Sequence, residues 1–370
     1  MNPEHYPRRI LLAVTGLSPQ VLTETLYALT QVQQPAFIPT EVHLITTQQG
    51  AEYARLTLLD NPHLGRFHQL LADFRLPAME FGPQQIHVIC DQNGQALSDI
   101  RTPSENASAA DCITALVRQL TSDDNAALHV SIAGGRKTMG FYLGYALSLF
   151  GREQDRLSHV LVSDPFESNH EFYYPPPQPQ VLFTRENKPI STADAKLELA
   201  SIPFVRMRDS ISPTLVSGAD SFGAIVTATQ RSLAPPKLTI YRDRNRIECG
   251  GITVEMPPIQ YAFYRWLAER SLRLGAPQSF VRYTDPVHAE FLEIYRQTVT
   301  SMADDYEQLK AQLEQDGFSK KFFEQKKSKA NSLLKTALRL DADRYLIVGD
   351  GKRPQTRFGI DLPADCIRLA

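Results

Sequence analysis

The chain has 370 residues, and its 39 Lys and Arg against 41 Asp and Glu give a formal net charge of −2. This length predicts two domains, and the near-neutral balance excludes a global basic field that would attract nucleic acid, leaving only local basic surfaces. The four cysteines form no C-x-x-C pair, which argues against a zinc site or a disulfide framework and favours a reducing cytoplasm. We expect no signal peptide and no membrane span, because no apolar run is long enough.

Strand and helix patterns alternate along the first 165 residues. The apolar segment 8–14 predicts a buried strand, and a helix pattern follows from residue 20 to residue 31. Further strands are predicted at residues 41–47, 87–90, 128–132 and 159–163, with helices between them. This alternation predicts an α/β fold with a doubly wound, mostly parallel sheet of the Rossmann-like kind. Ligands of such sheets bind at the carboxyl ends of the strands.

The most informative stretch is residues 129–150, HVSIAGGRKTMGFYLGYALSLF. It predicts a strand, a turn at Gly134 and Gly135, the basic residues Arg136 and Lys137, the hydroxyl of Thr138, and an apolar helix. Glycines let a ligand approach the backbone, and unpaired N–H groups at a helix N-terminus favour an anion. The spacing is neither a Walker A loop nor G-x-G-x-x-G. The pattern indicates a phosphate or phosphodiester site; an ordinary turn with a solvated lysine is the alternative.

The first strand-to-helix turn carries two hydroxyls at the same predicted edge of the sheet. Thr15, Gly16 and Ser18 follow the strand, and Ser18 is expected to cap the helix with Pro19 in its first turn. Either Thr15 or Ser18 is a candidate for contact with a ligand bound to the glycine turn.

The character of the sequence changes after Pro235-Pro236, which we interpret as a linker between domains at 1–234 and 237–370. Hairpin, helices, basic helix and hairpin follow in the order of a winged helix-turn-helix. Residues 317–357 contain eleven Lys and Arg against four Asp and Glu. Phosphate attraction could make this surface DNA-binding, and a solvated face on an interdomain packing module is equally compatible. The candidate contacts are Lys326, Lys327, Lys329, Asn331, Lys335, Lys352, Arg353 and Arg357.

A second pattern in this part of the chain runs from Arg282 to His288, RYTDPVH. It fits the loose R-x(4–6)-H spacing of HEPN ribonucleases, in which arginine and histidine flank the scissile phosphate. Pro286 lies inside the pattern, and the neighbouring hairpins argue against an all-helical HEPN domain.

The first 200 residues resemble CRISPR-associated proteins with a CARF domain, related to ring nucleases and to the sensor half of type III CRISPR ribonucleases. The resemblance rests on the segments ILLAVTGLSPQVLTETLYAL, HLITTQQG, HVSIAGGRKTMGFYLGYALSLFGR and HVLVSDPFE. It implies a homodimer that binds cyclic oligoadenylate, with cyclic tetra-adenylate the expected ring, between the carboxyl edges of two sheets. The implied contacts are Lys137, Gly134, Gly135, Arg136 and Thr138 of the glycine turn, with Gly16 and either Thr15 or Ser18 of the first turn.

The resemblance leads to three hypotheses of different kinds. The first is a ring nuclease without metal or cofactor, in which a ribose 2′-OH attacks the adjacent phosphate. Lys137 would then stabilise the developing charge, and Ser18 or Thr15 would orient the hydroxyl. The second is a DNA-binding transcriptional regulator that senses the ring without cutting it. The third is a ring-activated ribonuclease that uses Arg282 and His288.

Overall fold

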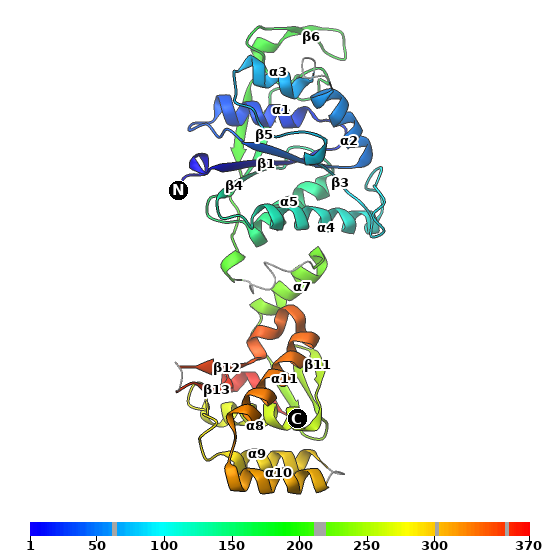
Figure 1. Ribbon diagram of the computed structural model, residues 1–370. Coiled ribbons are helices and arrows are strands. Elements are labelled where there is room, and N and C mark those ends of the chain that lie inside the picture. The colour runs from blue at the N-terminus through cyan, green and yellow to red at the C-terminus, as the bar shows by residue number, and fades with distance from the viewer. Residues whose placement is uncertain (61–64, 211–219, 300–302, 352–354) are drawn as a thin grey trace. The chain divides into compact units, whose positions relative to one another are not determined.

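The computed structural model describes residues 1–60, 65–210, 220–299, 303–351 and 355–370. The chain divides into two compact units, Met1–Gly223 and Ala224–Ala370 (Figure 1). The sequence places the division at Pro235-Pro236, about one helix later. The difference arises at α7 (Phe222–Leu233). Phe222 packs against Tyr142 and Tyr145 of unit 1, whereas Arg231 pairs with Asp341 of unit 2.

A six-stranded sheet forms the centre of unit 1, with the strand order β3-β2-β1-β4-β5-β8. Strands β1 to β5 are parallel, and β8 is antiparallel to β5. The predicted α/β class and mostly parallel sheet are therefore confirmed. The strands are β1 (Arg8–Val14), β2 (Glu41–Thr46), β3 (Ile86–Val88), β4 (Ala126–Ser131), β5 (Arg156–Val162) and β8 (Leu197–Ser201).

Helices cover both faces of this sheet (Figure 1). Leu11 and Ala13 of β1 lie in one buried cluster with Leu22 and Leu26 of α1, because alternate residues of a strand point to opposite faces. The helix pair α4 and α5 covers the other face. The helices are α1 (Gln20–Tyr27), α2 (Gln48–Ala54), α3 (Arg66–Asp73), α4 (Pro103–Leu120) and α5 (Lys137–Phe150).

The starts of α4 and α1 are defined by their caps, and the cap predicted for α1 is wrong by one residue. Thr102 caps helix α4. Its side chain accepts a hydrogen bond from the Glu105 N–H, and the Glu105 carboxylate accepts one from the Thr102 N–H. Pro103 occupies the first turn. These reciprocal bonds form a full capping box. Helix α1 begins at Gln20 with Pro19 in the capping position, so Ser18 lies one residue outside the helix.

The segment after β5 forms a hairpin of β6 (Val181–Phe183) and β7 (Pro189–Ser191) before the chain returns to the sheet as β8. Phe166 and Phe172 pack with Leu182 of this hairpin in a small buried cluster. The proline-rich residues that precede the hairpin therefore belong to an arm that is packed against unit 1.

Unit 2 contains the predicted hairpins and helices. Its sheet has the order β11-β10-β9-β14, and β12 and β13 form a separate antiparallel pair. The strands are β9 (Leu238–Tyr241), β10 (Arg246–Cys249), β11 (Ile252–Glu255), β12 (Ile347–Asp350), β13 (Arg357–Ile360) and β14 (Ile367–Leu369). The helices after α7 are α8 (Pro258–Leu274), α9 (His288–Thr298), α10 (Ala303–Asp316) and α11 (Lys320–Leu338).

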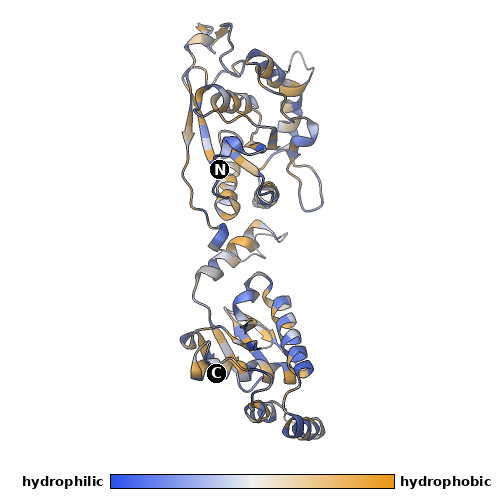
Figure 2. Cartoon of the chain, turned by 60° about the vertical axis from the view of Figure 1, so that its left-hand side comes forward, coloured by the Kyte–Doolittle hydropathy of each residue, from blue (hydrophilic) through white to orange (hydrophobic). Residues whose placement is uncertain are grey.

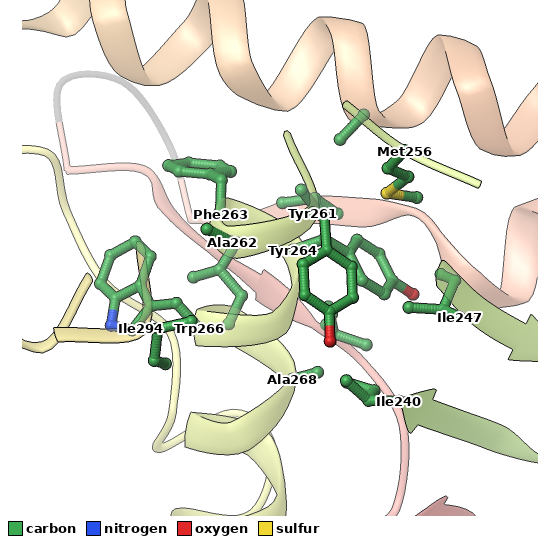
Figure 3. Close-up of a cluster of buried hydrophobic side chains, with 14 of the residues drawn as sticks. Ile240, Ile247, Met256, Tyr261, Ala262, Phe263, Tyr264, Trp266, Ala268 and Ile294 are labelled. Atoms are coloured by element: carbon green, nitrogen blue, oxygen red, sulfur yellow. The ribbon is translucent and has the colours of Figure 1, made fainter. Parts of the chain in front are cut away.

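Helix α8 is the centre of the core of unit 2. Its Tyr261, Tyr264 and Trp266 are at most 1% exposed, and they pack in one cluster with Ile240 and Ile247 of the strands (Figure 3). Buried aromatic side chains of this size contribute a large apolar area each. Tyr264 also donates its hydroxyl to the carbonyl of Tyr345, 2.7 Å away, so its polar end is satisfied inside the core. This core fixes the position of the helices around it.

Candidate functional site

The first and fourth strand-to-helix turns meet at the carboxyl edge of the sheet of unit 1. Strand β1 lies between β2 and β4, so the chain leaves β1 and β4 at the point where the strand order reverses. Ligands of doubly wound sheets bind at such a switch point. The structure therefore brings the two predicted turns together at the place where a parallel sheet offers a site.

The glycines allow these two turns to touch. A Cβ atom on Gly134 would lie 2.6 Å from the carbonyl oxygen of Val14, which is closer than real Cβ atoms come. A Cβ atom on Gly16 would lie 3.8 Å from the Cα atom of Gly135. Gly135 itself has φ +77°, a conformation that favours glycine. Glycine is thus required at position 134 by the close approach of the Val14 carbonyl, and at position 135 by the positive φ angle.

The two hydroxyls of the first turn have different surroundings. Thr15 is completely buried; its N–H donates to the Ile45 carbonyl at 3.0 Å and its Oγ1 donates to the Ser18 carbonyl at 2.8 Å. The Thr15 hydroxyl therefore closes the turn. Ser18 is exposed, with its side chain outside the first turn of α1. The sequence could not separate these two candidates, and the geometry leaves Ser18 as the hydroxyl that a ligand can reach.

Lys137 is the first residue of α5, and both Lys137 and Thr138 are exposed. The N–H groups in the first turn of a helix have no intrahelical partners, and the helix dipole adds partial positive charge there. Among the residues that the structure describes, no carboxylate lies within ion-pair distance of the Lys137 ammonium. An anion at this position would meet both the backbone donors and a full positive charge.

Arg136, the residue before α5, is held by a carboxylate that sequence reasoning missed. Its Nε and Nη2 donate to the two oxygens of Asp99, with Nε 3.1 Å from Oδ1. Arg101 Nε donates to the same carboxylate at 3.0 Å. The hydrogen bonds from Arg136, and secondarily from Arg101, lower the pKa of Asp99 to about 2. Two guanidinium groups thus share one carboxylate beside the glycine turn.

Asp99 belongs to a loop that follows β3 and contributes a third segment to this edge. The N–H of Gln48, at the start of α2, donates to the Leu97 carbonyl of the loop at 2.8 Å. The loop therefore connects the end of β2 with the N-terminus of α5 through Asp99. No local pattern could have found it, because Asp99 and Arg136 are 37 residues apart and meet only in the folded sheet.

Glu24 of α1 is a buried carboxyl of unit 1. Its side chain is 6% exposed. Burial, with a further contribution from the charge of Glu167, raises the pKa of Glu24 to about 8. Glu24 is therefore mostly protonated at neutral pH.

Two exposed apolar side chains flank the candidate site. Leu17 in the first turn is 61% exposed, and Phe141, one helical turn after Lys137, is 62% exposed. The Phe141 ring lies 5.7 Å from the ring of Tyr142 and 5.8 Å from that of Tyr145. Tyr142 and Tyr145 are themselves half-buried and pack against Phe222. Leu17 and Phe141 are thus available to a ligand or a second chain.

The predicted DNA contacts of unit 2 fall into three groups. Lys329 and Lys335 are exposed on α11. Lys326 and Lys327 are half-buried, with their ammonium groups 5.0 Å from the Phe322 ring and 4.2 Å from the Phe358 ring respectively, and Arg357 pairs with Asp350 at 2.9 Å. Lys352 and Arg353 lie outside the described residues.

Asn331 has a structural position instead of the predicted DNA contact. It donates to the Ile347 carbonyl and accepts from the Ile347 N–H, both at 2.9 Å. The side chain thus connects α11 to β12.

The Arg282–His288 pattern lies in the loop that precedes α9 and ends at the first residue of that helix. Arg282 is exposed, and its N–H donates to Asp285 at 2.8 Å. His288 is the first residue of α9, and its ring packs edge-on to the Phe318 ring at 6.5 Å. The surrounding sheet and hairpin give this region an α+β environment, unlike the all-helical domain in which the pattern is expected.

Within the described ranges, the structure has no group of three or more His, Cys, Asp or Glu side chains placed to hold a metal ion. In the same ranges, none of the helices combines the length and the apolar character that crossing a bilayer requires.

Comparison with known proteins now adds to this geometry. One solved structure, described as a type III CRISPR defence DNA nuclease activated by cyclic oligoadenylate, is similar over 86% of this chain and 36% of that chain. The sequence identity is 15% and the TM-score is 0.24, and this chain spans about a third of the length of that protein. No curated protein matches the chain.

A family model gives the stronger relationship. The model described as CRISPR-associated protein NE0113 matches residues 18–235, which is more than half of the chain and nearly the whole of unit 1 after its first turn. The matched range includes Ser18, Asp99 and the glycine turn with Lys137. This agrees with the resemblance predicted from the sequence motifs, and the chain belongs to this family of CRISPR-associated proteins.

Proposed function

We propose that unit 1 is a CARF-type sensor that binds cyclic oligoadenylate at the carboxyl edge of its sheet and cleaves the ring. The observation that supports this proposal is the close contact of the two glycine turns: exposed Ser18 follows one of them, and exposed Lys137 follows the other at the N-terminus of α5. A phosphodiester suits this combination because it offers an anionic group to the lysine and the backbone N–H groups. Membership of a CRISPR-associated family supports a nucleotide second messenger as the ligand.

The proposed working form is a homodimer with one ring between two copies of this edge. A cyclic oligonucleotide with an even number of nucleotides has two-fold symmetry, which matches an isologous dimer. The net charge at this edge is about +2 in each copy, because three positive side chains, Lys137, Arg136 and Arg101, surround the single negative charge of Asp99. Two copies then match the four phosphates of cyclic tetra-adenylate. Leu17 and Phe141 supply apolar contact around this charged centre.

Cleavage would proceed by attack of a ribose 2′-oxygen on the adjacent phosphorus. The 5′-oxygen of the next nucleotide leaves, and the products carry a 2′,3′-cyclic phosphate and a 5′-hydroxyl. The attacking hydroxyl loses its proton to water, and the leaving oxygen gains one from water. Ser18 orients the 2′-hydroxyl, whereas Lys137 and the N–H groups at the start of α5 stabilise charge on the phosphoryl oxygens. We expect slow turnover, because no histidine is assigned as the base.

The direct test is incubation of the pure full-length protein with cyclic tetra-adenylate and EDTA, with products followed by mass spectrometry. We expect linear oligoadenylate with a terminal cyclic phosphate, and we expect K137A to abolish it. K188A is the matched control, because Lys188 is an exposed lysine on the β6–β7 hairpin of the same unit. An intact ring with ring-dependent cutting of other RNA would instead support the Arg282–His288 ribonuclease, and an intact ring alone would support a sensor without nuclease activity.

A further inference from the structure

We propose that the exposed face of α11 in unit 2 is a binding surface for double-stranded DNA. This activity lies beyond the proposed ring chemistry of unit 1 and does not depend on it. Helix α11 carries both hydrophilic and hydrophobic residues along its length (Figure 2). Its buried side contains Phe323, Ala330, Leu334 and Leu338, and the half-buried Phe322 and Leu333 pack against the same core. The exposed residues of α11 lie on the face that is left.

The exposed face of α11, which we call the α11 stripe, carries positive charge and hydrogen-bonding groups and has no carboxylate. Its members are exposed and recur at helical spacing. Glu324, near the start of the helix and half-buried, is the single acidic residue of α11. The stripe consists of Lys321, Gln325, Ser328, Lys329, Ser332, Lys335 and Thr336.

In the part of the chain that the structure describes, the lysines of the stripe have no charged partner. Among the described residues, no carboxylate lies within ion-pair distance of Lys321, Lys329 or Lys335. Two other basic residues nearby are engaged: Lys327 lies over the Phe358 ring, and Arg357 pairs with Asp350. The stripe therefore presents uncompensated charge, which attracts the phosphates of a nucleic acid and is reported by the salt dependence of binding.

Hydrogen bonds hold α11 beside the β12–β13 hairpin. The Val281 N–H and carbonyl bond to the Phe358 carbonyl and N–H in an antiparallel bridge, so the segment between α8 and α9 joins the β12–β13 hairpin as a third strand. Asn331 ties α11 to β12. In chain order the elements are α8, the bridge at Val281, α9, α10, α11 and the β12–β13 hairpin, so α11 is the last helix before the hairpin. In helix-turn-helix modules the recognition helix enters the major groove.

The chemistry of the stripe favours a duplex over single-stranded nucleic acid and over an apolar protein partner. Single strands are bound by exposed aromatic side chains on which bases stack, and the stripe contains none. None of the large exposed apolar side chains in the described part of the chain lies on α11. Lysine, serine, threonine and glutamine side chains contact phosphates and base edges of duplex DNA.

The test measures binding of the full chain to a fluorescein-labelled duplex of mixed sequence by fluorescence anisotropy, over a range of salt concentrations. K329E/K335E should weaken binding roughly tenfold or more and lower the slope of log affinity against log salt by about 2. K188E/K196E makes the same change in net charge on exposed lysines of unit 1 and should leave affinity within about twofold. K329Q/K335Q repeats the test without charge reversal, and circular dichroism checks that each variant is folded.

Three results would overturn the proposal. The first is a wild-type chain that does not bind the duplex even at low salt. The second is an equal loss in the α11 and unit 1 variants, which would make net charge the cause. The third is a preference for single-stranded RNA that K329E/K335E removes, which would assign the α11 stripe to a different ligand. Each of these results leaves the ring-cleavage assay of unit 1 unaffected, so the two proposals fail independently.

Discussion

The two cationic surfaces of this protein are built in opposite ways. At the carboxyl edge of unit 1, Lys137 is combined with backbone N–H groups and with turns packed so tightly that Gly134 has no room for a Cβ atom. On α11, the exposed lysines Lys321, Lys329 and Lys335 project from a regular helix. The first arrangement suits one small ligand held in a fixed pose, and the second suits a long polyanion bound through many contacts. Mutations should therefore have concentrated effects in unit 1 and distributed effects in unit 2.

The largest effect is expected from K137A. Removing one preorganised group that stabilises charge in a transition state costs about 10²–10³-fold in rate. Single-turnover cleavage of cyclic tetra-adenylate measures this loss, and K188A should retain the wild-type rate. A K137A rate within a few-fold of wild type would mean that the edge of unit 1 does not work through concentrated contacts.

The second prediction tests the fit between the turns. In G134A, the new Cβ atom would meet the Val14 carbonyl at 2.6 Å, so the turns must separate, and we expect weaker ring binding and a melting temperature lowered by several degrees. G140A is the matched control in the same motif, because a Cβ atom there would make an ordinary 3.5 Å contact with Ile132. Because alanine favours a helix more than glycine does, G140A should melt at the same temperature as the wild type or at a higher one. Equal melting temperatures for the two variants would contradict the close packing.

The third prediction concerns the pH dependence of the stability of unit 1, which contains Glu24. The folded-state pKa of Glu24, about 8, exceeds the usual 4.5, so the protonated carboxyl favours the folded state. This stability is complete below about pH 4.5 and is lost as the pH rises through about 8. E24Q should therefore melt at a higher temperature than wild type near pH 9 and at a similar temperature near pH 5. Parallel melting curves of wild type and E24Q against pH would show that Glu24 titrates normally.

The smallest effect is expected from single changes on the α11 stripe. K329A removes one phosphate contact among several, so duplex affinity should fall by less than tenfold and the salt slope by about 1. A loss as large as that of K329E/K335E would place a single dominant contact on α11 and remove the contrast with unit 1.

Much of this organisation could be predicted from the sequence because it depends on local signals. The apolar strand 8–14, the glycines at 134 and 135 and the basic residues after them indicate a parallel sheet with a ligand edge. The choice between Thr15 and Ser18 could not be made, since it depends on the Ile45 carbonyl of the neighbouring strand and on the turn closed by the Thr15 hydroxyl.

The features that sequence reasoning missed depend on contacts across long separations. Asp99 reaches Arg136 only after β3 and β4 take their places in the sheet. The bond of Asn331 to Ile347 likewise requires α11 to pack beside β12. Hydrogen bonds of this kind leave no periodic trace, so an exposed polar residue and a structural one look alike in the sequence.

The central claim is that the glycine turns of two chains hold one adenylate ring. Isothermal titration calorimetry of the full-length protein with cyclic tetra-adenylate tests it most directly, with S18A used to slow cleavage during the titration. We predict saturable binding at one ring per two chains, with affinity greatly reduced when Lys137 is also replaced by alanine. An absence of binding to rings of any size, or binding that is indifferent to Lys137, would contradict the account.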